Sequence, residues 1–370
     1  MLVSAASGIV VAFFVWRRGD ASPVPPWQDV PPGQAFAEDA TAEQLNAVTE
    51  KMANALTERF PDEPAALHVL ARWKYVSGDL REASNLWSRC VELDPTFGGA
   101  LYALAVVALE QDRAGEAVDF LERLRLLAPE DVRVPVLLAE GLVAEDRVEE
   151  ARIVLEDHVA RERASAEAMV GLGDIYLRLA RPEEAIRAYE IAVASTAEHG
   201  AALYGLGRAY AAAGDQAASA DALRRFERVA ETRVETESDR AKGFLDRDSS
   251  RIAAAQAHDD AGEVYERLGD LPLAEELWRK AVFLDPGNVR YWRRLFALYR
   301  DQGDRLRALQ VAEKIASLSP HDVNAWLNLA VLHAESERPD DALRAVETAI
   351  RLEPNNPRCR EARKLVNTVQ

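Results

Sequence analysis

The sequence predicts an all-α protein, a solenoid of antiparallel helix hairpins that stack on one another. The stretch His258–Pro286 shows the unit, because two apolar stripes at helical spacing are separated there by Gly269-Asp270. Glycine can end the first helix in a left-handed conformation, the aspartate can accept hydrogen bonds from the amides that open the second helix, and Pro286 stops that helix. Neither helix can bury its apolar stripe alone, so each hairpin needs neighbours.

Small residues repeat through the chain at the interval of this hairpin. Two series of small residues recur at a constant interval along the chain. Each series has one longer interval, which ends at Ala274 in the first series and at Gly262 in the second. The series on the second helices contains Ala83, Ala117, Ala151, Ala185, Ser219, Ala274, Ala308 and Ala342. The series on the first helices contains Ala71, Ala105, Ala139, Gly173, Gly207, Gly262, Phe296 and Ala330. Small residues let two helix backbones approach closely, so the series predict eight hairpins in a continuous core.

Larger residues also recur at fixed places in the hairpins. They include Trp292, Leu295 and Tyr299; Trp326, Leu329 and Ala330; Leu172, Gly173 and Tyr176; Leu206, Gly207 and Tyr210; and the closing Pro95, Pro129, Pro286, Pro320 and Pro354. With these residues the chain resembles the tetratricopeptide repeat family over roughly residues 64 to 354. The resemblance implies a right-handed superhelix whose first helices line a groove for partner peptides. Repeats three to five have Arg163, Ala197 and Glu231 in place of the closing proline.

Charge and cysteine content exclude several classes of function. The net charge of −17 argues against a nucleic-acid binder, because phosphate contacts need clustered lysine and arginine. The two cysteines, Cys90 and Cys359, belong to hairpins seven layers apart, and helices pack about 8–10 Å from one another. We therefore expect no internal disulfide, and the redox compartment stays open.

The first residues form an apolar run, Leu2–Trp16, that ends at Arg17-Arg18. A helix of this length spans about 22 Å, less than the roughly 30 Å of a hydrocarbon core. Three interpretations stay open: an uncleaved membrane anchor, a secretory signal cut after Ala21, and a misassigned start codon. For an anchor, the paired arginines place the repeats on the cytoplasmic face, while a periplasmic or secreted body stays open. The layout is similar to that of bacterial inner-membrane tetratricopeptide proteins that regulate envelope assembly.

The chain divides into segments in a simple order. We expect a membrane anchor or signal segment at 1–18, a proline-rich linker at 19–40, a lead-in capping helix at 41–63, repeats one to five at 64–227, a charged insertion at 228–254, repeats six to eight at 255–356 and a C-terminal capping helix at 357–370. The insertion is either a solvated helix extension with a loop, or a contact arm for a partner or a regulated segment. In repeat seven Phe296 replaces a small residue and Ala312 replaces a bulky one, so we expect Phe296 to pack over Ala312.

The sequence contains no motif that brings reactive groups together. His258, His333 and His158 occupy positions that packed residues hold in other repeats, no His-Glu-x-x-His pair occurs, and Gly205-Leu-Gly207 lacks the third glycine of a dinucleotide loop. We expect no catalytic residue, no cofactor, no metal and no small-molecule substrate.

One basic patch stands out in the acidic chain. Arg290, Arg293 and Arg300 share the first helix of repeat seven, with Asn324 and Asn328 on the next first helix. These five residues are the predicted partner-binding site, either for a carboxylate of a partner or as solvated arginines paired with nearby acids such as Asp301. The sequence thus predicts a membrane-tethered, non-catalytic scaffold or adaptor that binds partner peptides in its groove. The alternative is a recruiting or regulatory subunit of an envelope-assembly or enzyme complex encoded elsewhere.

Overall fold

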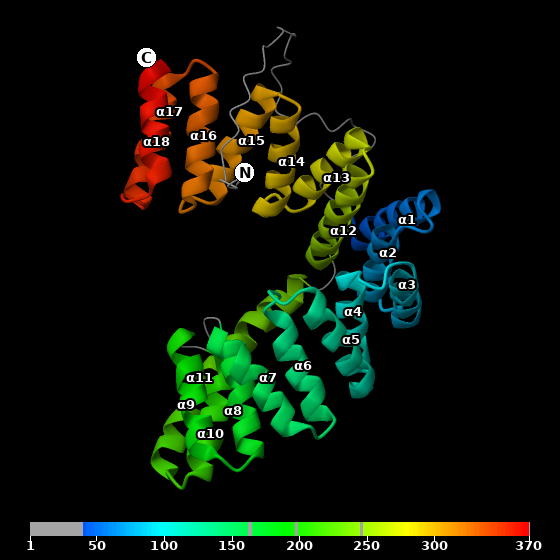
Figure 1. The fold of residues 1–370 in the computed structure, drawn as a ribbon, viewed down its shortest axis with the longest axis vertical. Helices are drawn as coiled ribbons and strands as arrows, with labels where there is room; N and C mark the ends of the chain where they lie inside the picture. Colours follow the sequence, from blue (N-terminus) through cyan, green and yellow to red (C-terminus); the bar gives the residue numbers. More distant parts are fainter. Residues whose placement is uncertain (1–39, 162–164, 197–198, 245–246, 370) are drawn as a thin grey trace, which may run out of the picture. The chain divides into compact units, whose positions relative to one another are not determined.

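The computed structural model describes residues 40–369, apart from 162–164, 197–198 and 245–246. The predicted anchor or signal segment and most of the linker lie outside the described residues. Contacts divide the chain into two compact units, Phe36–Asn288 and Val289–Gln370, and each is treated by itself (Figure 1). Within the described residues all regular structure is α-helical, and none of these helices combines the length and the apolar character that crossing a membrane requires.

The helices pair into hairpins. After the single helix α1 (Ala42–Arg59), the first five hairpins are α2 (Pro64–Val76) with α3 (Leu80–Leu93), α4 (Gly98–Glu110) with α5 (Ala114–Leu127), α6 (Arg133–Ala144) with α7 (Val148–Arg161), α8 (Ala166–Arg178) with α9 (Pro182–Ser195), and α10 (Gly200–Ala212) with α11 (Gln216–Phe244). The next three are α12 (Arg247–Arg267) with α13 (Leu271–Leu284), α14 (Val289–Asp301) with α15 (Arg305–Leu318), and α16 (Val323–Glu335) with α17 (Pro339–Leu352), followed by α18 (Pro357–Val369). The prediction of an all-α solenoid of helix hairpins is confirmed.

The turn inside each hairpin has one residue in the left-handed conformation. Four of these residues are glycines, with φ between 73° and 89°. The other four are Asp112, Asp146, Ala180 and Glu337, at φ of 55° to 62°. All eight stand at the same repeat position. The turn geometry is therefore the same throughout, although only half of the hairpins have the residue that adopts it without strain.

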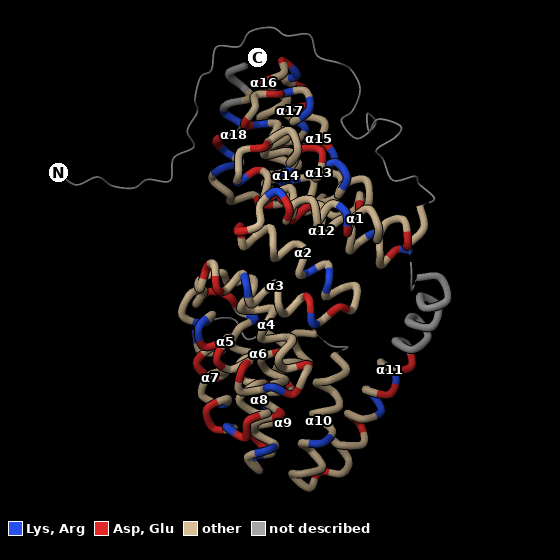
Figure 2. The backbone as a smooth tube through the Cα atoms, turned by 90° about the vertical axis from the view of Figure 1, so that its right-hand side faces the viewer, with Lys and Arg blue, Asp and Glu red and all other residues tan. Residues whose placement is uncertain are grey.

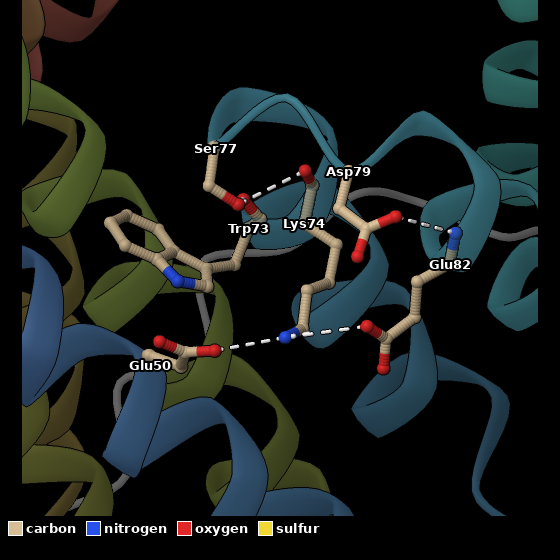
Figure 3. A network of polar contacts seen from close by, with 6 residues as sticks. All are labelled: Glu50, Trp73, Lys74, Ser77, Asp79 and Glu82. Atoms are coloured by element: carbon tan, nitrogen blue, oxygen red, sulfur yellow. Dashed lines mark hydrogen bonds and ion pairs between the residues drawn. The ribbon is translucent and has the colours of Figure 1, made fainter.

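The first five hairpins of the unit Phe36–Asn288 stack in sequence order. The first helices of the second to fifth hairpins form a row, since α6 contacts both α4 and α8, and α8 contacts α10. Helix α1 packs on α2, and its N-terminus is capped by Thr41, whose hydroxyl accepts a 3.2 Å hydrogen bond from the backbone N–H of Gln44. Lys74 of α2 links the first three helices, because its amine lies 2.8 Å from Glu50 of α1 and 3.4 Å from Glu82 of α3 (Figure 3). Glu50 and Glu82 together raise the pKa of Lys74.

The sixth hairpin departs from the predicted stacking order. Helix α12 packs against α1 and α2 rather than extending the row beyond α10 and α11 (Figure 1). Arg59 lies 2.9 Å from Asp270, Glu63 lies 2.6 Å from Arg267, and the rings of Phe60 and Tyr265 are 5.7 Å apart. The expected continuous core is therefore wrong at this step. Helix α12 also begins at Arg247, ahead of the predicted opening near residue 255.

Helix α11 fills most of the predicted insertion. It has 29 residues, more than twice the 13 of α10, and therefore spans about 43 Å. Only residues 245 and 246 separate its end from α12. The one longer step in the repeat is thus accommodated chiefly by lengthening two helices, and not by a long loop.

The unit Val289–Gln370 contains two hairpins and α18. Helix α18 contacts both α16 and α17, and Cys359 is fully buried beside Val323, Leu327 and Ala349. Both cysteines of the chain are buried free thiols. Phe296 and Ala312 are both buried within the α14–α15 hairpin, as the predicted exchange of bulk requires.

Candidate protein-binding surfaces

A groove of about 520 Å³ lies on the first helices α6, α8 and α10. Val136, Val143 and Val170 contribute apolar side chains that are only half-buried. Val136 and Val170 stand one repeat apart, at a repeat position that Tyr102 and Tyr204 fill in the second and fifth repeats. The valines leave space where tyrosines would project, and the space runs on beside Gly171, which also lines the groove.

Tyr189 of α9 contacts Asp174, one of the residues that line this groove. It is fully buried, and its hydroxyl donates a 2.7 Å hydrogen bond to Oδ1 of Asp174 on α8. Its ring fits only because Gly173 and Gly205 have no side chains: a Cβ on either would lie 2.5 Å or less from ring atoms. Burial and the Asp174 carboxylate raise the pKa of Tyr189, so the phenol stays protonated. Arg208 of α10 lies 3.5 Å from the same oxygen of Asp174.

Two other carboxylates line the groove. Glu140 of α6 and Glu167 of α8 are exposed, and neither has an ion pair or hydrogen bond with another described residue. Arg178 lies eleven residues after Glu167 on the same helix, roughly 16 Å along its axis. The groove therefore combines an apolar floor with two carboxylates that have no internal cation.

The predicted arginine and asparagine site lies in the other unit. Arg290, Arg293 and Arg300 are exposed on α14, and Asn324 and Asn328 are exposed on α16. Arg293 Nη2 lies 2.8 Å from Oδ2 of Asp322, whose other oxygen accepts a 2.9 Å hydrogen bond from the backbone N–H of Asn324. The structure therefore links Arg293 to Asn324 through one aspartate.

Arg300, another member of the site, has local contacts. Arg300 lies 3.2 Å from Asp301, and its guanidinium carbon is 6.0 Å from the centre of the Phe296 ring. These contacts match the interpretation in which the arginines pair with nearby acids. They are pairs between exposed side chains, which contribute about 0–1 kcal/mol each, so a partner's carboxylate can replace them at small cost.

Arg358 extends this face, although it is not part of the predicted site. Its Nη1 donates a 2.7 Å hydrogen bond to Oδ1 of Asn324. Arg290, Asn324 and Arg358 follow one another at the repeat interval, on α14, α16 and α18. Continuing the repeat register past the last hairpin would have found it. Figure 2 shows the other basic residues of α18 in blue.

Two family models agree with the repeat pattern. Both are described as "Tetratricopeptide repeat", one matching residues 76–140 and 299–365 and the other residues 170–230, together somewhat more than half of the chain. This chain is a tetratricopeptide-repeat protein. No curated protein matches its sequence significantly.

Several solved structures are similar to this tetratricopeptide-repeat protein at low sequence identity. A crystal structure of MamA is 20% identical and covers 44% of this chain and 95% of its own, with a TM-score of 0.41. YrrB, described as "a TPR protein with an unusual peptide-binding site", is 19% identical over 48% of this chain and 91% of its own, with a TM-score of 0.41. MamA from Desulfovibrio magneticus RS-1 is 18% identical over 50% and 96%, with a TM-score of 0.41.

Two of the three histidines considered in the sequence, His258 and His333, are buried in this tetratricopeptide-repeat protein. His258 is 1% exposed, burial lowers its pKa to about 4, and its Nδ1 lies 2.7 Å from the Ala254 carbonyl oxygen. His333 is buried too, which lowers its pKa, while His158 is half-buried. In the part of the chain that the structure describes, no three His, Cys, Asp or Glu side chains are grouped as a metal site.

Proposed function

We propose that this protein is a non-catalytic scaffold or adaptor, and that the exposed face formed by Arg290, Arg293, Arg300, Asn324 and Asn328 binds an acidic segment or free carboxylate of a protein partner. Tetratricopeptide-repeat proteins are in general interaction scaffolds without catalytic groups. The observation that carries the proposal is the series Arg290, Asn324 and Arg358, which presents hydrogen-bond donors at one repeat position on three helices.

The chemistry of the face suits a carboxylate. A guanidinium offers planar, paired N–H donors that match the two oxygens of a carboxylate. The side chains of Arg293 and Arg300 are 58% and 61% exposed, so each stays accessible to a partner despite its internal ion pair. A segment bound across α14 and α16 meets arginine on one helix and amide groups on the next.

The test measures binding of a labelled acidic peptide of about ten residues by fluorescence anisotropy. We expect the Arg290→Glu/Arg293→Glu/Arg300→Glu variant to weaken binding by at least about tenfold, since each lost charge-assisted contact is worth on the order of 1 kcal/mol. The matched control, Arg338→Glu/Arg344→Glu/Arg351→Glu, makes the same charge change on exposed arginines at and within the second helix α17.

Equal losses in the two variants would show that only net charge matters and would reject the site. An amidated peptide separates a free terminal carboxylate from acidic side chains. Crosslinking capture in the native cell with the same pair of variants then names the partner.

We further propose that the apolar run Leu2–Trp16 tethers the chain to a membrane, with the repeats on the cytoplasmic side. The support comes from the uncharged run, from Arg17-Arg18 after it, and from the five prolines between Ala21 and Gly33, which suit an extended spacer. Extraction of membranes with alkaline carbonate, and protease access in right-side-out vesicles, test the tether. Release by carbonate, or digestion of the repeats from outside, would contradict it.

A further inference from the structure

The groove on α6, α8 and α10 points to a partner of different chemistry. We propose that it binds an extended protein segment in which an aliphatic side chain stands next to lysine or arginine. This surface belongs to the unit Phe36–Asn288, whereas the proposed arginine face belongs to the unit Val289–Gln370. The two proposals can therefore fail independently.

The floor of the groove supplies the aliphatic part of the site. Val136, Val143 and Val170 line it as half-buried side chains, and Ala139 and Ile175 line it as buried residues. A volume of about 520 Å³ falls within the range of about 300–1,000 Å³ that is typical of ligand pockets. Burying an aliphatic side chain there gains about 25 cal/mol for each Å² of apolar surface removed from water.

The carboxylates determine the sign of the charge that the groove accepts. Asp174 is already engaged, because Tyr189 donates to it and Arg208 lies beside it. Glu140 and Glu167 have no such contacts within the described residues, and they stand on consecutive first helices that touch each other. In the repeat register they stand seven residues apart, roughly 10 Å along the helix axis, so each attracts a separate ammonium or guanidinium of a bound segment, whereas a carboxylate at either place meets a like charge.

The repeat itself shows that the groove is specific to these hairpins. At the position of Val136 and Val170, the neighbouring repeats have Tyr102 and Tyr204. At the position of Glu140, the second repeat has Val106, the fourth has Asp174, which contacts Tyr189 and Arg208, and the fifth has Arg208 itself. Among the first five hairpins, only α6 and α8 therefore combine a small side chain at the tyrosine position with a carboxylate that has no cation. The bound part of the partner segment is limited to the few residues that these two helices can contact.

Three labelled peptides of about ten residues test the proposal by fluorescence anisotropy with the full-length protein. Their alternating side chains are leucine with lysine, leucine with glutamate, and serine with lysine. We expect the leucine–lysine peptide to bind at least about tenfold more tightly than either of the others. The Glu140→Lys/Glu167→Lys variant should bind the leucine–lysine peptide at least about tenfold more weakly than wild type, and should bind the leucine–glutamate peptide more tightly.

Two further variants separate the groove from net charge and from folding. Asp119→Lys/Glu227→Lys makes the same charge change on exposed residues of the second helices α5 and α11, and should change binding by less than about twofold. Val170→Tyr fills the groove with the residue that the adjacent repeat has at this position. The circular dichroism spectrum should therefore stay unchanged, whereas binding of the leucine–lysine peptide should be lost.

The outcomes decide between the sources of binding. Equal binding of the serine–lysine peptide, or equal losses in Asp119→Lys/Glu227→Lys, would mean attraction to an acidic protein in general and would overturn the proposal. Tightest binding of the leucine–glutamate peptide would overturn it as well. The Arg290→Glu/Arg293→Glu/Arg300→Glu variant should leave leucine–lysine binding unchanged, which keeps this result separate from the proposed arginine face.

Discussion

Adding one methyl group at Gly205 tests how tightly Tyr189 is held between the first helices. The Cβ of a Gly205→Ala variant would lie 2.3 Å from Cε1, 2.4 Å from Cζ and 2.8 Å from the hydroxyl oxygen of Tyr189. Carbon atoms in contact normally stay about 3.5–4.0 Å apart, so the ring or α10 must move by roughly 1 Å. Either movement also pulls the phenol away from Asp174, with which it makes a 2.7 Å hydrogen bond.

The sign of the effect separates packing from helix propensity. Alanine in place of glycine inside an exposed helix stabilises it by about 1 kcal/mol. Overpacking a core costs about 1–3 kcal/mol, and the lost hydrogen bond costs about 1 kcal/mol more. We therefore expect Gly205→Ala to lower the free energy of unfolding by about 1–3 kcal/mol, measured by urea denaturation followed by circular dichroism.

A double variant and a control complete this experiment. Tyr189→Leu places at this position the residue that Leu121, Leu155 and Leu223 provide in other repeats, so Gly205→Ala should become neutral or stabilising in that background. Gly200→Ala, where the added Cβ meets nothing closer than 3.8 Å, should not destabilise the protein. An increase in stability in Gly205→Ala alone would refute the account of a filled interface.

Three further predictions concern the turns, a buried histidine and the docking of α12. Ala180→Gly removes a left-handed alanine at φ 56° on the surface and should raise the unfolding free energy by about 0.5–1 kcal/mol, seen as a higher urea midpoint. The pKa of His258 is about 4 when folded and about 6.5 when unfolded, so its contribution to stability is full above about pH 6.5 and falls toward pH 4. Relative to wild type, His258→Leu should therefore gain about 2 kcal/mol between about pH 7 and pH 5, in paired denaturation curves. Asp260→Ala removes the partner of Arg72 between α12 and α2, and should speed hydrogen exchange in α1 and α12 but not in α8.

Local rules of the sequence account for most of the fold. Gly269 and Asp270 form the predicted turn, with Gly269 at φ 84° and the Asp270 side chain accepting a hydrogen bond from the Leu273 amide. Helix α1 begins after Thr41, at the start of the expected lead-in helix. Such features depend on residues a few positions apart, and the repeat shows each of them several times.

The docking of α12 on α1 and α2 could not be predicted in the same way. A repeat pattern states that a hairpin needs a neighbour on each side, but it does not state which neighbour. The contacts that decide it, such as Arg59 with Asp270, join residues 211 positions apart. Their side chains have no common pattern, so only the three-dimensional structure reveals the pairing.

The two candidate surfaces differ in how the sequence encodes them. The arginine face contains Arg290, Asn324 and Arg358, which occupy the same position in successive repeats. It therefore depends on a polar residue that recurs at one repeat position. The groove depends on what single repeats change: Val136 and Val170 in place of tyrosine, and Gly171 where the preceding repeat has Leu137. Because the backbone is the same in every hairpin, a residue that is smaller than its counterparts leaves a space, and a charge without a counterpart stays unpaired. Comparing each position with its equivalents in the adjacent repeats therefore locates binding surfaces that a search for motifs overlooks.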